Sequence, residues 1–149
     1  MNTLKIEIIA NPENQASLVS RLYIDQNDLI LMLKNHEKIY AKREGSEQIA
    51  GQYEGLNPQT LYNNLNMLEG SHNSTDEKVD ILDCECGTWG CWAMMISVTT
   101  ELETITWSNF EQLHRGITSH NQWNYDEFGP FIFDKKAYKV ELEKLISRP

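Results

Sequence analysis

Residues 92–110 constrain the fold most, because they predict two neighbouring β-strands joined by a tight turn. The first half of this segment, WAMMISVTT, is apolar on both faces, which is typical of a strand in the middle of a sheet. The second half, ETITWSNF, follows a turn near Glu101-Leu102-Glu103 and is expected to pair with the first half. A central strand has a neighbour on each side, so the fold must contain further strands.

Further strands are predicted at residues 3–9, 17–24 and 79–84. In the first of these, Leu4, Ile6 and Ile8 lie on one side, the alternation of a half-buried strand. The polar stretch NPENQ then predicts a turn, so that residues 17–24 form a hairpin partner for residues 3–9. The segment VDILDC predicts one more strand, just before the cysteine-rich stretch.

Residues 25–44 predict an amphipathic helix. Asp25 or Asn27 can begin it by accepting a hydrogen bond from the first free backbone amides. The predicted buried face contains residues at helical spacing: Leu29, Met32, Leu33, His36, Ile39 and Tyr40. Because His36 lies on this apolar face, we expect a histidine whose hydrogen bonds are satisfied at the edge of the core.

Two shorter helices are predicted further along the chain. Asn57 as cap and Pro58 at the first helical position begin one of them. Asp134 is expected to cap the last helix, whose predicted buried stripe contains Tyr138, Leu142, Leu145 and Ile146. Residues 44–56 hold three glycines and predict an irregular loop. Together these patterns predict one α+β domain over residues 1–149, with an antiparallel sheet of about five strands and about three helices.

The charge of the chain is concentrated in its middle. The net charge is −9, and residues 51–110 carry nine acidic side chains against one lysine, Lys78. Nucleic-acid binding requires a basic surface, so this composition excludes it. An acidic surface instead attracts a cationic partner and speeds its encounter.

Nothing in the sequence indicates a membrane protein. No run approaches the roughly 18 apolar residues that a membrane helix needs. The N-terminal stretch MNTLKIEIIANPENQ lacks the features of a secretory signal. We therefore expect a cytoplasmic protein.

The stretch DCECGTWGCW, residues 83–92, contains every cysteine of the chain. Thiolates are good zinc ligands, and a tetrahedral site built on this stretch needs one ligand from elsewhere. His114 is the best candidate for the fourth ligand and His72 is the next, which gives the candidate set Cys84, Cys86, Cys91 and His114. Alternatively, the glycines only bend the chain and the thiols pack as small apolar groups. We favour this connector and expect no cofactor, because the paired C-x-x-C spacing of a strong zinc signal is missing.

A thiol enzyme is the third interpretation of the same stretch. Cys91 and His114 would serve as nucleophile and base. Asp83 and Glu85 flank Cys84, and their negative charge opposes formation of a thiolate there. Since no catalytic motif accompanies these residues, we expect that the protein is not an enzyme.

Five blocks of the chain form one pattern: RLYIDQNDLI (21–30), IAGQYEGL (49–56), LDCECGTWGCW (82–92), ITWSNFEQLHR (105–115) and FGPFIFDKKAYKVELEKL (128–145). Together they resemble a family of small uncharacterised bacterial proteins. The family pattern has a C-x-C-G-x-x-G-C-W turn and a G-P-F-x-F-D block near the C-terminus, and the likeness covers most of residues 18–146. Ala93 stands where the family often has proline. The resemblance implies one compact domain without an established activity, and a single structural device made of Cys84, Cys86, Gly87, Gly90 and Cys91.

The composition leads to a functional hypothesis of a non-catalytic acidic binding protein. The specific prediction is an immunity-type inhibitor that neutralises a basic toxin, for example a nuclease. The predicted partner-binding residues are carboxylates with two tryptophan anchors: Asp76, Glu77, Asp80, Asp83, Glu85, Glu101, Glu103, Trp89 and Trp107. The alternative function is that of a small zinc-binding protein in which the metal holds the cysteine turn.

Overall fold

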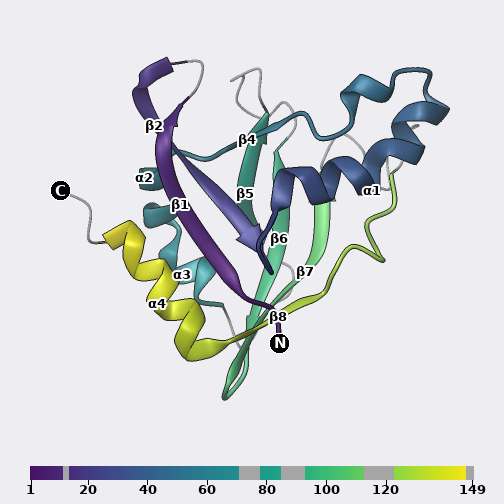
Figure 1. Ribbon diagram of the computed structural model, residues 1–149. Coiled ribbons are helices and arrows are strands. Elements are labelled where there is room, and N and C mark those ends of the chain that lie inside the picture. The colour runs from purple at the N-terminus through teal and green to yellow at the C-terminus, as the bar shows by residue number, and fades with distance from the viewer. Residues whose placement is uncertain (12–13, 71–77, 85–92, 113–122, 147–149) are drawn as a thin grey trace.

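The computed structural model describes residues 1–11, 14–70, 78–84, 93–112 and 123–146. The strands are β1 (Leu4–Asn11), β2 (Asn14–Ile24), β3 (Asn27–Asp28), β4 (Tyr53–Gly55), β5 (Val79–Cys84), β6 (Met94–Thr100), β7 (Thr104–Gln112) and β8 (Phe131–Asp134). The helices are α1 (Leu29–Arg43), α2 (Pro58–Asn63), α3 (Leu65–Leu68) and α4 (Lys135–Ile146), with a short 3-10 helix at Glu47–Ile49 (Figure 1). Within these residues the strands form two antiparallel sheets, in the orders β1-β2-β3 and β4-β5-β6-β7-β8. The predicted α+β fold with a five-stranded antiparallel sheet is confirmed.

The central strand predicted from residues 92–100 is β6. It lies between β5 and β7, and Met94, Ile96 and Val98 are buried along it. The turn into β7 is closed by a hydrogen bond from the Glu101 amide to the Thr104 carbonyl, at 2.9 Å. Because β6 is paired on both sides and most of its residues are buried, its composition is largely apolar.

The N-terminal hairpin forms its own small sheet. β1 pairs with β2 from Leu4 opposite Ile24 onward, and β3 turns back after two residues and pairs antiparallel with the end of β2. Asp25 and Gln26 in that turn both have positive φ, 53° and 72°, as in the tight turns that suit twisted hairpins. The prediction that Asp25 or Asn27 caps the helix is therefore wrong: the cap is Asp28, whose side chain accepts from the Ile30 amide at 2.8 Å.

Helix α1 confirms the predicted helix, but its buried face is rotated. The residues fully buried along it follow a spacing of four: Leu29, Leu33, Glu37 and Ala41. Ile39, which was expected to be buried, is 55% exposed. Glu37 therefore lies on the buried face of α1, where the sequence pattern predicts only apolar residues and His36.

Helices α2 and α4 begin as the sequence predicts, and α3 is a separate short turn of helix after α2. The Asn57 side chain accepts from the Gln59 amide at 2.8 Å, and the Asp134 side chain accepts from the Ala137 amide at 2.9 Å. Tyr138, Leu142 and Leu145 are buried on α4, whereas Ile146 is 55% exposed. No helix among the described residues is long and apolar enough to cross a membrane.

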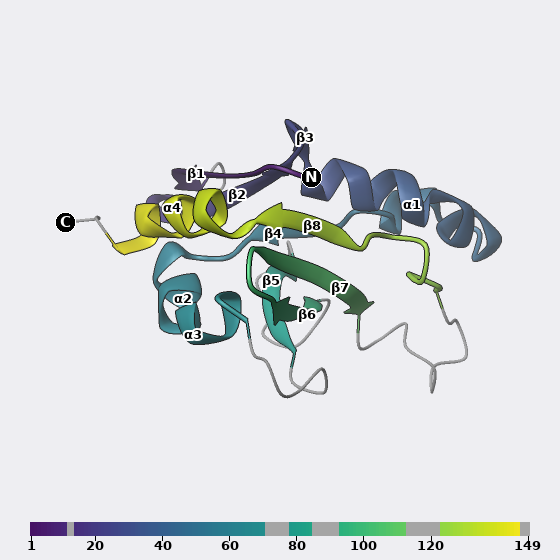
Figure 2. The same cartoon turned by 90° about the horizontal axis from the view of Figure 1, so that it is seen from below.

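The two sheets are joined by a close backbone approach between β2 and β4. Viewed from below, the small sheet and α1 lie on the same side of the five-stranded sheet (Figure 2). Ser20, fully buried, donates to the Leu56 carbonyl from its amide at 2.8 Å and from its hydroxyl at 2.9 Å. A Cβ added at Gly55 would lie 1.8 Å from the Ser20 carbonyl oxygen. Only glycine therefore allows this approach, which explains a glycine inside a strand.

We predict that Gly55→Ala destabilises the protein by about 3 kcal/mol or more, because the new methyl group overlaps backbone that cannot move without parting the sheets. Gly45→Ala is the matched control. Gly45 has a φ of +78° with open space around it, so alanine there costs only about 1–2 kcal/mol of backbone strain. Urea denaturation followed by circular dichroism measures both losses. Equal losses in the two variants would contradict the proposed role of the β2–β4 approach.

Candidate functional site

A β-bulge in β5 turns two carboxylates to the same side of the sheet. Asp80 pairs with Met95 and Leu82 pairs with Met94, so two positions of β5 are spanned by one of β6. Residues three apart in a regular strand point to opposite faces. The extra residue, Ile81, shifts the alternation by one position, so that the side chains of Asp80 and Asp83 point to the same face. Both line the same cleft.

A third carboxylate joins them from the neighbouring strand. Glu54 of β4 is the direct partner of Asp83 of β5 in the strand register. Like charges directly opposite each other in a sheet are destabilising. Burial raises the pKa of Asp80, and the nearby Asp83 carboxylate raises it further. At Asp80 the negative charge therefore costs folding free energy.

These carboxylates line a cleft of about 500 Å³ between β2, the start of α2 and the face of β4, β5 and β6. The rest of the lining is neutral, with apolar and polar side chains: Leu18, Val19, Leu56, Ala93, Met95, Asn11, Ser17, Asn57 and Thr60. Among the described residues, no group of three or more His, Cys, Asp or Glu side chains is arranged to hold a metal ion. A cleft with an acidic wall and apolar neighbours suits an organic cation with an aliphatic stem.

The residues of the predicted interface fall into two groups at opposite ends of β6. Asp80 and Asp83 lie in the cleft, whereas Glu101 and Glu103 are exposed at the β6–β7 turn beside Leu102, which is 90% exposed. Because β6 separates these two groups, they are roughly 20 Å apart along the strand direction. Asp76, Glu77, Glu85 and Trp89 lie outside the described residues.

The prediction that Trp107 is an interface anchor is wrong. Trp107 is 1% exposed and packs edge-on against Phe133, with ring centres 5.3 Å apart. Its indole N–H donates to the Tyr138 hydroxyl at 3.0 Å, and that hydroxyl donates to the Leu68 carbonyl at 2.6 Å. The alternation of Ile105 with Trp107 on one face of β7 is the signal that indicates a core position.

The zinc candidates cannot be compared with one another in space. Cys84 ends β5, but its side chain lies outside the described part of the chain, as do Cys86, Cys91 and His114. His72, the other candidate for the fourth ligand, lies outside it too. Zinc binding and thiol chemistry at this stretch stay predictions.

The sequence did not predict a buried polar cluster around Glu37. The side chain is fully buried, and its carboxylate accepts from the Gly51 amide at 2.8 Å and from the hydroxyls of Tyr53 and Tyr125 at 2.6 and 2.7 Å. Tyr53 in turn accepts from the Gln112 side-chain amide at 2.8 Å. Burial raises the pKa of Glu37 despite these donors. The one sequence signal was a glutamate spaced four residues from Leu33 and Ala41 on the buried stripe.

The same region is tied to α1 by aromatic and histidine contacts. His36 Nε2 donates to the Asn124 carbonyl at 2.7 Å, and its ring stacks on Tyr125 with centres 5.4 Å apart. The Trp123 indole N–H donates to the Glu44 carboxylate. The prediction that His36 is a satisfied histidine at the edge of the core is confirmed. We interpret the Glu37 cluster as a structural tie, since it joins α1 to residues 51–53 and to Tyr125.

Comparison of the chain with protein-family models, curated proteins and solved structures gave no match. The resemblance to small bacterial proteins stays a prediction.

We predict that the free energy of unfolding contributed by Glu37 falls as the pH rises. A carboxyl group whose pKa is raised on folding binds its proton more tightly in the folded state, so stability is lost as the pH passes from the unfolded pKa, near 4.5, through the folded pKa. The loss is about 1.4 kcal/mol for each unit by which the pKa is raised. Glu37→Gln removes this titration.

Urea denaturation of both proteins between about pH 4.5 and 8 tests this prediction. The stability of the unsubstituted protein minus that of Glu37→Gln should decrease across this range. Glu47→Gln removes an exposed carboxylate instead and is the matched control for the loss of one negative charge. A difference for Glu37→Gln that is flat or rises with pH would contradict the assignment.

Proposed function

We propose that this protein is a non-catalytic acidic binding protein, and that its cleft receives a cationic side chain of a basic protein partner. The observation that carries the proposal is the cleft itself: Glu54, Asp80 and Asp83 meet on one face beside apolar neighbours. Three carboxylates that line one cleft give it a negative potential, which attracts a cationic group.

The lining favours lysine or arginine over a small inorganic cation. Leu18, Val19 and Met95 offer apolar surface to an aliphatic stem, while the carboxylates meet the charged head. A cleft of about 500 Å³ is in the range of sites that hold a small ligand or a few side chains. The occupant we expect is therefore a projecting basic side chain on the surface of a partner.

The wider charge distribution supports attraction of the same partner. The central sixty residues carry one lysine, and Lys78 is already engaged with the Glu111 carboxylate at 3.1 Å and the Asn109 carbonyl at 2.9 Å. Glu101 and Glu103 add exposed charge at the far end of β6. Such a surface steers a positively charged protein toward it over a distance of about one Debye length, roughly 8–10 Å.

An immunity-type inhibitor of a basic toxin is the specific role we propose. A nuclease toxin must carry a positive cleft in order to bind its substrate. A small acidic protein that fills this cleft with carboxylates, and takes one basic side chain into its own cleft, blocks substrate by charge and by shape. Such an inhibitor would act in the cytoplasm, where the toxin meets nucleic acid.

The cleft can be tested without the partner by titrating the protein with tetralysine and recording NMR shifts. We expect the shifts to centre on residues around Asp80 and Asp83. The double variant Asp80→Asn/Asp83→Asn should bind tetralysine about tenfold more weakly, because two partly buried charge contacts are lost. Glu101→Gln/Glu103→Gln removes the same charge away from the cleft and should bind nearly as well as the unsubstituted protein. Equal weakening in both variants would mean general attraction without a site.

The partner class is tested by affinity capture with three forms of the chain. The unsubstituted protein and Glu101→Gln/Glu103→Gln should retain the same basic protein from a lysate of the source cells, and Asp80→Asn/Asp83→Asn should lose it. Expressing the captured protein alone should arrest growth, and adding the chain should restore it. A captured protein that is acidic, or that is retained equally by the cleft variant, would argue against the inhibitor role.

A further inference from the structure

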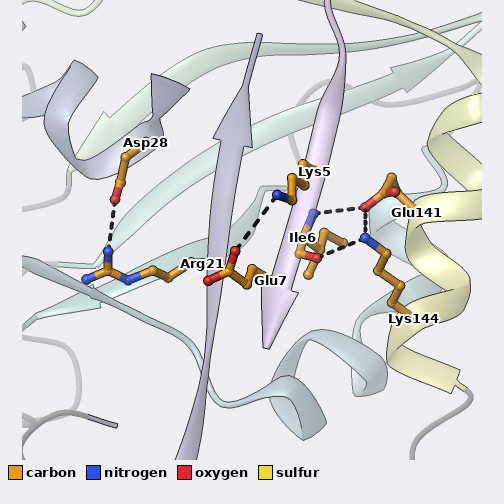
Figure 3. A network of polar contacts seen from close by, with 7 residues as sticks. All are labelled: Lys5, Ile6, Glu7, Arg21, Asp28, Glu141 and Lys144. Carbon is orange, nitrogen blue, oxygen red and sulfur yellow. Dashed lines mark hydrogen bonds and ion pairs between the residues drawn. The ribbon is translucent and has the colours of Figure 1, made fainter. Parts of the chain in front are cut away.

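The outer edge of β1 is occupied by two side chains of α4. On its inner side β1 pairs with β2 along its length. On the other side, the Ile6 amide donates to Glu141 Oε2 at 2.9 Å and the Ile6 carbonyl accepts from Lys144 Nζ at 3.2 Å (Figure 3). Glu141 and Lys144 also form an ion pair at 2.9 Å. The two side chains thus make the hydrogen bonds that a neighbouring strand would make.

This contact lies where a sheet is most prone to pair with another chain. The backbone groups of an edge strand form a template for a further strand. In an antiparallel strand, alternate residues direct their N–H and C=O groups to the same side. Since Ile6 directs both groups outward, Leu4 and Ile8 do so as well. The edge around Ile6 therefore has the pattern that a new strand could pair with.

The sequence of β1 is complementary to itself about Ile6. If a second copy pairs antiparallel around this residue, Ile6 meets its own equivalent and Leu4 meets Ile8 on the inner, apolar face. On the outer face, Lys5 of each copy meets Glu7 of the other. Lys5 and Glu7 have 60% and 43% of their side chains exposed and lie 3.9 Å apart within one chain. Both faces of such a pair would therefore match, in polarity on one face and in charge on the other.

We infer that the outer edge of β1 is a strand-pairing surface for a second copy of this chain, and that Glu141 and Lys144 hold it closed in the monomer. Pairing requires these side chains to leave Ile6 and α4 to move aside. Tyr138, Leu142 and Leu145 are buried on the same helix, so helix packing and the two contacts to Ile6 together favour the closed form, and removing the contacts shifts the balance toward the open form. The inference is independent of the acidic cleft, because none of the residues in it lines that cleft.

Removing the two side chains tests the closure. We expect Glu141→Ala/Lys144→Ala to form a dimer in sedimentation equilibrium, with a mass that rises with concentration toward twice that of the chain. Lys139→Ala/Glu143→Ala is the matched control, because both residues are exposed on the same helix and the same charges are removed. The control and the unsubstituted protein should stay monomeric at the same concentrations.

Charge exchange tests the register. In the Glu141→Ala/Lys144→Ala background, Lys5→Glu sets carboxylates opposite each other and should weaken the dimer at least about tenfold. Adding Glu7→Lys restores the opposite pairing in the dimer and the ion pair within each chain, so the dimer should return.

A folded Glu141→Ala/Lys144→Ala variant that stays monomeric would overturn the inference, and so would a dimer that is indifferent to Lys5→Glu. Circular dichroism establishes whether the variant folds. If the double variant does not fold, the single variant Glu141→Ala is compared with Glu143→Ala. Glu141→Ala keeps the Lys144 contact to Ile6, which helps it to fold, and it should still dimerise more strongly than Glu143→Ala.

Discussion

The architecture depends on the contact between Gly55 and Ser20, where two sheets approach each other through their backbones. The Ser20 amide and hydroxyl both donate to the Leu56 carbonyl, so the polar groups of this junction are satisfied although it is buried. Glu54, Gly55 and Leu56 also line the cleft. The junction that holds the small sheet against the large one therefore also sets the width of the candidate site.

At the cleft, the position of Asp80 reduces the stability of the fold. Glu54 on β4 lies directly opposite Asp83 on the adjacent strand β5. Asp80 is half-buried near the Asp83 carboxylate. Sequences usually agree with their fold at every level, and local conflicts gather at functional sites. Here the conflict is produced by the bulge at Ile81, without which Asp80 and Asp83 would point to opposite faces. The bulge aims these two carboxylates at one space, which is the physical basis for proposing a binding role there.

The sequence predicts the long, periodic parts of the fold well. The strand β6, the hairpin it makes with β7 and the helices α1 and α4 each repeat an apolar pattern over several turns or residues, which fixes the type of each element, although the buried face of α1 is rotated from the predicted one. The caps Asn57 and Asp134 follow from the chemistry of free backbone amides at helix ends. Strands β4 and β8 were missed because they are short and are defined by their neighbours in the sheet.

The candidate site was predictable only in part. Asp80 and Asp83 were named as partner-binding residues because of the acidic composition around them. The position of Glu54 depends on the pairing of β4 with β5, which no local pattern contains. Trp107 was assigned to the surface because tryptophan is common in interfaces, although its alternation with Ile105 matched the core. Composition gave the sign of the charge, and strand register decided which charges meet.

Several carboxylates in the described part of the chain take part in the fold itself. Asp28, Asp134, Glu37 and Glu141 each accept a hydrogen bond from a backbone amide, and so they help to close helix ends, a buried junction and a strand edge. Such carboxylates serve the fold, whatever the net charge of the chain. Asp80 differs, because its strongest influences are burial and another carboxylate, both of which disfavour its charge. A negative surplus therefore supports a partner most at positions such as Asp80, where burial and a neighbouring carboxylate both disfavour the charge.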